Sequence, residues 1–120
     1  MATKFKYIDL EYLISTTGEN NEMITEMIDV FLEQIIEFDN DFDSLVQSED
    51  FVEIGKHAHK VKSSILIVGM SGIVDTIVKL EAECDGAKDL AKVQAMVKEI
   101  KDFYHAGSEE LKIARNDYVA

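Results

Sequence analysis

The stretch "ITEMIDVFLEQIIEFDNDFDSL" (24–45) decides the fold of this 120-residue chain. Its apolar side chains recur at alternating steps of three and four residues, which places them along one face of an α-helix. The members of this stripe are Ile24, Ile28, Phe31, Ile35, Phe38, Phe42 and Leu45. A stripe this narrow predicts a long helix that packs nearly parallel to its neighbours.

Three further segments carry the same pattern: residues 51–68, 73–84 and 90–111. They are separated by the short polar or glycine-bearing joints 47–50, 69–72 and 84–88, which force consecutive helices to run antiparallel. The segment "DLEYLIS" (9–15) predicts a short helix before the first long one. We therefore expect an all-α fold, an up-down-up-down antiparallel four-helix bundle with a short N-terminal helix across one end.

Local signals indicate where these helices begin and end. Asp9, Ser48 and Ser71 have the side chains of N-caps, and Gly69 and Gly86 are expected helix stops. The β-branched run "SSILIVGMSGIV" (63–74) could also be a buried strand. A lone strand among helices would have nothing to pair with, so we predict helix there.

Composition and charge restrict the class of protein. The length and the apolar fraction of 47% indicate one globular domain over residues 1–120. A net charge of −12 argues against nucleic acid or an anionic membrane as a partner, and favours a partner with a basic rim or a metal ion. The longest strictly apolar run, 65–68, is far too short to span a bilayer. The single cysteine fits a reducing cytoplasm, so we expect a cytoplasmic protein.

The candidate functional residues lie in "HAHKVKSS" (57–64), which holds two of the three histidines. Each helical residue advances by about 100°, so His59 points about 130° away from the core direction, towards solvent. His57 lies about 70° away on the opposite flank, a boundary position. Two histidines chelate one metal from a helix at i, i+3 or i, i+4, not at i, i+2. We therefore expect no metal site.

The helical neighbours of His59 leave its ring accessible. Gly55 and Ser63 are small, Lys62 places an ammonium one turn away, and Leu66 with Ile67 adds apolar surface on the same side. This geometry fits a docking site around the imidazole, but it also fits an ordinary surface histidine. The residues alone leave both readings open.

The order of residues in "AHKVKSSILIVG" (58–69) resembles the signature of histidine-containing phosphotransfer (HPt) domains. That signature has Ala-His, a lysine three residues after the histidine, a small pair and then a glycine. Segments 8–35, 48–60 and 79–84 are similar to the flanking helices of the family, so the resemblance runs from about residue 5 to 111. Ser63 departs from the pattern, because the family commonly has glycine there.

The resemblance implies that His59 is phosphorylated, that Lys62 stabilises the phosphoryl charge, and that Ser63 lies beside the phosphoryl group. The residues expected to dock the partner are Gly55, Lys56, Leu66 and Ile67. The partners would be receiver domains of response regulators or hybrid histidine kinases. Such a receiver would supply Mg²⁺, and the chain itself, expected to be a monomer, would need no cofactor. No nucleotide-binding motif is present, so we expect no autonomous kinase activity.

Two other functions fit parts of the sequence. A bundle of the same shape could dock receivers or kinases as a phosphorylation-silent adaptor, although the presence of both His59 and Lys62 favours the active version. A helical metal-binding protein is disfavoured by the spacing of the histidines.

Overall fold

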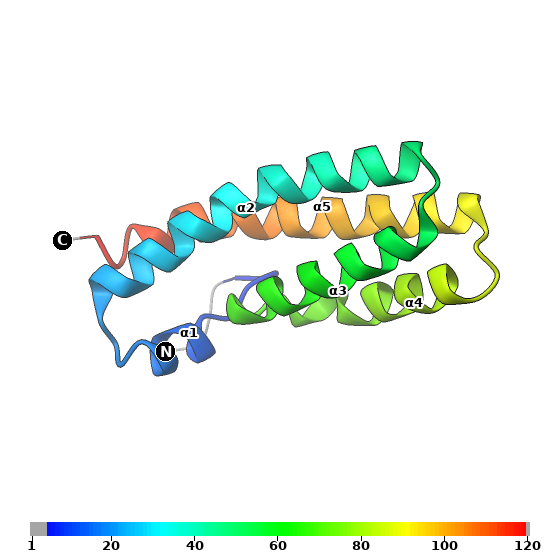
Figure 1. The fold of residues 1–120 in the computed structure, drawn as a ribbon. Helices are drawn as coiled ribbons and strands as arrows, with labels where there is room; N and C mark the ends of the chain where they lie inside the picture. The colour runs from blue at the N-terminus through cyan, green and yellow to red at the C-terminus, as the bar shows by residue number, and fades with distance from the viewer. Residues whose placement is uncertain (1–4, 120) are drawn as a thin grey trace.

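The computed structural model describes residues 5–119, and all the regular structure in that range is helical (Figure 1). The elements are α1 (Glu11–Thr16), α2 (Asn21–Gln47), α3 (Phe51–Ile67), the 3-10 turn η1 (Ser71–Ile73), α4 (Val74–Asp85) and α5 (Leu90–Arg115). The predicted all-α class is confirmed, and the β-branched run from residue 63 continues α3 rather than forming a strand. None of the described helices is long and apolar enough to cross a membrane.

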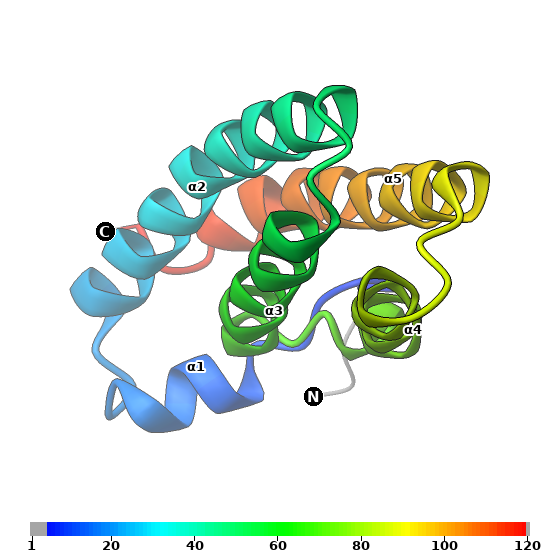
Figure 2. The ribbon, with the colours of Figure 1, turned by 45° about the vertical axis from the view of Figure 1, so that its right-hand side comes forward.

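The four long helices pack in a closed ring. Helix α2 contacts α3, α3 contacts α4, α4 contacts α5, and α5 returns to contact α2. Figure 1 shows the chain reversing its direction between one long helix and the next. After a turn of the view, α3 and α4 still lie next to each other, with α1 near the end of α3 (Figure 2). We call the contact between α3 and α4 the α3–α4 seam, and the contact between α2 and α5 the α2–α5 seam.

The core consists of the predicted stripes. In α2 the six apolar residues from Ile24 to Phe42 are buried, and the stripes of the other three long helices meet them. Only the members at helix ends, Leu45, Phe51 and Leu90, are half-buried. Removal of these faces from water is the main favourable term that holds amphipathic helices together.

The N-cap residues of three long helices are acidic or amide side chains, and they are not the residues predicted from the sequence. Asn20, Asp50 and Asp89 cap α2, α3 and α5, each accepting a hydrogen bond from the backbone N–H three residues later. Ser48 was predicted to begin a helix but is the C-cap of α2. The prediction was wrong because Asp50, two residues later, provides the stronger cap for α3.

The other two predicted caps also differ. Asp9 precedes the cap residue of α1, although its carboxylate accepts a hydrogen bond from the N–H of Glu11. Ser71 opens η1 instead of capping it. Gly86 does end α4 as predicted, being its C-cap residue.

The segment before α1 lies against the end of α3, and Gly69 makes this possible. The backbone N–H of Asp9 donates to the carbonyl of Val68 at 3.2 Å. Gly69 has φ of +73°, and a Cβ there would overlap the backbone of Asp9. Glu110 of α5 holds the same segment by accepting hydrogen bonds from the N–H groups of residues 6, 7 and 8. Gly69 thus ends α3, as predicted, and admits a neighbouring backbone.

Candidate functional site

His57 is a buried residue of α3, and its predicted boundary position is wrong. Its side chain faces α2, where Nε2–H donates to the carbonyl of Phe38 at 3.3 Å and the ring packs edge-on against Phe42. The residue is 7% exposed. Burial lowers the pKa of His57 below its ordinary value, despite the hydrogen bond to Phe38 and the nearby charge of Asp41, which raise it. The ring is therefore a neutral part of the core.

His59 faces α4 with one edge of its ring and solvent with the other. Its side chain is 64% exposed, and Nδ1 lies 3.3 Å from Oε2 of Glu81. An ionised carboxylate only accepts hydrogen bonds, so this contact requires the proton on Nδ1. A neutral imidazole with Nδ1–H has a free lone pair on Nε2, so Nε2 is the ring nitrogen that can act as a nucleophile.

Lys62 lies one turn after His59 and binds the same carboxylate. Its ammonium is 3.0 Å from Oε1 of Glu81, and its side chain is 22% exposed. The structure thus brings His59 and Lys62 together, as the sequence predicted, through a third residue that the sequence reasoning missed. The available signal was the position of Glu81 next to the apolar stripe residue Leu80 in "KLEAEC" (79–84).

Ser63 is exposed on the same face of α3. Its hydroxyl donates to the backbone carbonyl of His59 at 3.3 Å, within its own helix. The side chain therefore keeps to the helix surface and leaves the space above His59 open.

A hollow of about 300 Å³ lies beside His59, between α3 and α4. Its lining residues are Phe51, Val52, Gly55, Lys56, His59, Glu81, Cys84 and Asp85. A Cβ on Gly55 would lie 3.3 Å from the Cβ of Cys84, so the glycine lets the two helices approach closely. Two of the predicted docking residues, Gly55 and Lys56, thus adjoin His59.

The other two predicted docking residues do not line this hollow. Leu66 is exposed further along α3, and Ile67 is half-buried and packs against the core. Whether a partner touches all four residues stays a prediction.

Other chemistry finds little support near His59. Burial raises the pKa of the Cys84 thiol, which keeps it protonated and unreactive. Within residues 5–119 no group of three histidine, cysteine, aspartate or glutamate side chains could hold a metal ion. The rings of His57 and His59 also have different partners, on α2 and on α4.

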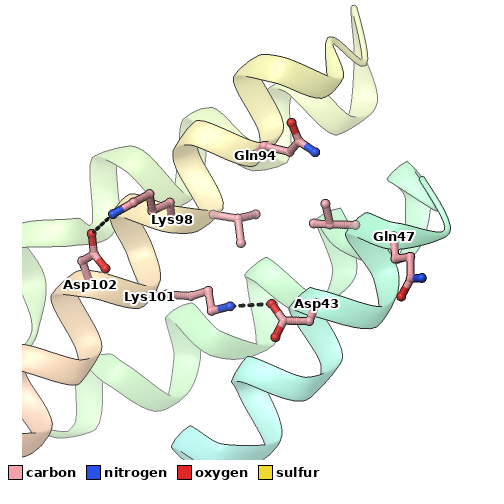
Figure 3. Close-up of a pocket in the computed structure, with 8 residues that line it drawn as sticks. Asp43, Gln47, Gln94, Lys98, Lys101 and Asp102 are labelled. Carbon is pink, nitrogen blue, oxygen red and sulfur yellow. Dashed lines mark hydrogen bonds and ion pairs between the residues drawn. The ribbon is translucent and has the colours of Figure 1, made fainter.

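A second hollow, of about 420 Å³, lies between α2 and α5 (Figure 3). Its two lysines are both in ion pairs, Lys98 with Asp102 and Lys101 with Asp43. None of the predicted site residues lines it. The candidate site is therefore the one on the α3–α4 seam.

Comparison with protein families gives one match. The Hpt domain model matches residues 26–109, most of the chain. The chain belongs to the Hpt domain family, whose members carry out phosphotransfer in phosphorelays and interact with receiver domains of two-component systems. Searches of curated proteins and of solved structures gave no match.

Proposed function

We propose that this protein is a phosphorelay intermediate whose His59 accepts a phosphoryl group from the aspartyl phosphate of one receiver domain and passes it to another. The observation that carries the proposal is the state of the His59 ring: Nδ1 is bound to Glu81, and the other edge is open to solvent. The carrier is a monomer, built as an up-down-up-down antiparallel four-helix bundle with α1 across one end.

The transfer step needs little from this chain. The bond between phosphorus and the aspartyl oxygen of the receiver breaks, and its electron pair stays on the departing carboxylate. The lone pair of Nε2 forms the new bond to phosphorus, and the ring keeps its Nδ1 proton and becomes cationic. Onward transfer reverses these bond changes. Phosphoryl transfer depends chiefly on positioning and charge stabilisation, and Lys62 supplies one positive charge for it.

The receiver contributes what this site lacks. Its aspartate would donate or accept the phosphoryl group, and a Mg²⁺ ion bound to the receiver would supply the remaining charge stabilisation, so the Hpt chain needs no cofactor and does not phosphorylate itself. Gly55 and Lys56 beside His59, together with Leu66 and Ile67 further along α3, would dock the receiver, and the small Ser63 leaves room for the incoming phosphoryl group. The exchange takes place in the cytoplasm, with receiver domains of response regulators or hybrid histidine kinases as partners.

The test is to incubate the protein with phosphorylated receiver domains and look for label that is acid-labile and base-stable. Wild type should acquire such label and His59→Gln should not. His105→Gln is the matched control, because it removes an exposed histidine on α5 and should leave labelling unchanged. Label on His59→Gln, or none on wild type with any candidate receiver, refutes the proposal. In the second case the phosphorylation-silent adaptor becomes the better account.

A further inference from the structure

A third hollow lies where α2 meets α3, on the side of α3 that faces α2, whereas His59 faces α4. Its volume is about 350 Å³, which is at the small end of the range of sites that bind small molecules. Its lining residues are Asp41, Ser44, Leu45, Glu53, Lys56, His57 and Lys60. The proposed phosphotransfer uses none of these groups except Lys56, which also borders the hollow beside His59.

His57 brings an unused hydrogen-bond acceptor into this hollow. Its Nε2–H donates to the carbonyl of Phe38, so the neutral ring carries its free lone pair on Nδ1. Nδ1 has no hydrogen-bond partner within residues 5–119, yet no buried side-chain nitrogen or oxygen in that range lacks one. Nδ1 therefore lies at the surface, where the small exposed part of His57 belongs to the wall of the hollow.

Opposite charges flank this acceptor without neutralising each other. Burial dominates the lowered pKa of His57, and the smaller effects of Asp41, which raises it, and Lys60, which lowers it, show that both charges lie close to the ring. Neither Asp41 nor Lys60 is in an ion pair in the part of the chain that the structure describes. The other two charges of the hollow, on Lys56 and Glu53, already pair with each other at 3.3 Å. The hollow therefore offers one free anion and one free cation.

We propose that this hollow binds a small zwitterion of the α-amino acid class. The ammonium of the ligand donates to Nδ1 of His57 and meets the carboxylate of Asp41, and the carboxylate of the ligand binds the ammonium of Lys60. The half-buried Leu45 provides an apolar wall for the side chain of the ligand. A ligand with a single charge would leave one of the two protein charges unmatched, and a ligand without N–H or O–H would leave Nδ1 without a donor.

The place of His57 in the core supports a role for its free nitrogen. Burial of an imidazole costs hydration, and in this protein only Nε2 is compensated, by the carbonyl of Phe38. The ring otherwise packs edge-on against Phe42, as an aromatic side chain without nitrogen could do. A ligand N–H on Nδ1 would satisfy the second nitrogen and stabilise the same tautomer.

The test is an NMR titration of the whole protein with L-leucine near neutral pH. This probe is a zwitterion whose side chain is long enough to contact Leu45. Isocaproate, which lacks the ammonium, and isoamylamine, which lacks the carboxylate, are the matched control ligands. We expect saturable shifts of the amide resonances around the hollow, half-complete at roughly 1 mM, as for a ligand with few contacts. Each control ligand should bind roughly tenfold more weakly, because one charge-assisted hydrogen bond is lost.

Two substitutions in the protein remove one charge each. Asp41→Asn and Lys60→Gln keep the size of exposed side chains, so the fold is retained, and each should weaken L-leucine binding by roughly tenfold. Lys92→Gln is the matched control, because it removes a lysine charge from an exposed position on α5 and should bind L-leucine as wild type does.

The ¹⁵N resonance of Nδ1 of His57 distinguishes the proposed contact from a diffuse attraction of charges. It should move on binding, because the nitrogen changes from a free acceptor to a hydrogen-bonded one. The ring resonances of His59 should stay in place, because that ring faces α4.

The outcomes decide this inference without deciding the proposed function. Saturable binding of L-leucine that moves Nδ1 of His57 and is weakened by Asp41→Asn and Lys60→Gln supports the inference. It is overturned if L-leucine produces no saturable shift, if either control ligand binds as well, if Lys60→Gln binds like Lys92→Gln, or if the Nδ1 resonance does not move. Each of these results leaves the transfer of phosphate to His59 untouched, because the ligand contacts neither His59 nor Lys62.

Discussion

Two histidines that lie two residues apart on α3 differ because different helices face them. The ring of His57 is enclosed by Phe38 and Phe42 of α2, where a charged imidazole would lose its hydration. The ring of His59 meets a carboxylate of α4 on one edge and water on the other. One ring is therefore part of the core, and the other has the open nitrogen that phosphotransfer requires.

The burial of His57 predicts a pH dependence of stability. The lowered pKa means that the unfolded chain takes up a proton near pH 6.5 while the folded protein does so only at lower pH. The unfolded state then binds more protons, so the His57 contribution is complete above pH 6.5 and is lost as the pH falls through the folded pKa. We expect NMR titration to place the pKa of His57 below 6.5.

The check on stability compares wild type with His57→Gln, which retains a donor for Phe38. The variant should lack this part of the decline in the free energy of unfolding below pH 6.5. A His57 that titrates at or above 6.5 would contradict the account of its burial.

Lys62 predicts an effect on transfer without an effect on the fold. In Lys62→Ala the positive charge near the phosphoryl group is lost. We expect transfer from a phosphorylated receiver to slow by about tenfold, a smaller loss than that caused by removing a donor from an enclosed active site. Lys60→Ala is the control, since it removes the same charge from an exposed position on the same helix. Circular dichroism should show unchanged helicity in both. Equal slowing in the two variants, or loss of helicity in Lys62→Ala, would count against the role given to Lys62.

At the scale of the elements, Gly69 fixes how the chain enters the fold. Gly69 has a positive φ, and the backbone of Asp9 occupies the place that its Cβ would take. Gly18 also has a positive φ, +64°, but no atom lies within 4 Å of the place that its Cβ would take. Gly18→Ala should therefore cost only the backbone strain, about 1 kcal/mol. Gly69→Ala adds the overlap with Asp9 and should cost about 3 kcal/mol. Urea unfolding measures both, and equal losses would show that the contact with Asp9 is unimportant.

Much of the helical layout could be predicted from the sequence because burial enforces it. The stripe from Ile24 to Phe42 indicates a long helix by its extent, and its period indicates which face of α2 is buried. Four such stripes predict the all-α class. Helix boundaries were harder, because Ser48 and Asp50 compete for the start of α3 and only their hydrogen bonds distinguish them.

The pairing across helices could not be predicted in the same way. The position of Glu81 opposite His59 and Lys62 depends on the rotation and axial shift of α4 relative to α3, which a helical wheel of either segment does not contain. The same limit applies to His57. Its angle on α3 placed it at the boundary, and the aromatic rings of α2 that cover it are brought there by packing.

At the scale of the whole molecule, charge is distributed unevenly. Helix α2 carries eight carboxylates and no lysine or arginine, and three of them pair with α5: Asp29 with Arg115, Asp39 with His105, and Asp43 with Lys101. Helix α3, which presents His59, has three lysines and one glutamate. An anionic aspartyl phosphate is therefore attracted to α3 and repelled by α2.

This distribution predicts that association with a receiver depends on salt and on Lys56, the α3 lysine that lines the hollow beside His59. Lys56→Glu should lower the association rate roughly threefold at low ionic strength, an effect of steering that salt removes. Lys98→Glu on α5 is matched to it, because the two side chains are 74% and 77% exposed and each pairs with one nearby carboxylate. Stopped-flow binding measures both. Equal effects of the two substitutions would mean that net charge, not the α3 surface, governs the encounter.

The central claim is that His59, and not its neighbour His57, carries the phosphoryl group. The most direct measurement is the fragmentation mass spectrum of the protein after reaction with a phosphorylated receiver, kept at alkaline pH to preserve phosphohistidine. We predict phosphate on His59 in wild type and in His57→Gln, and none on α3 in His59→Gln. Phosphate on His57, or on any residue of the His59→Gln protein, would contradict the account.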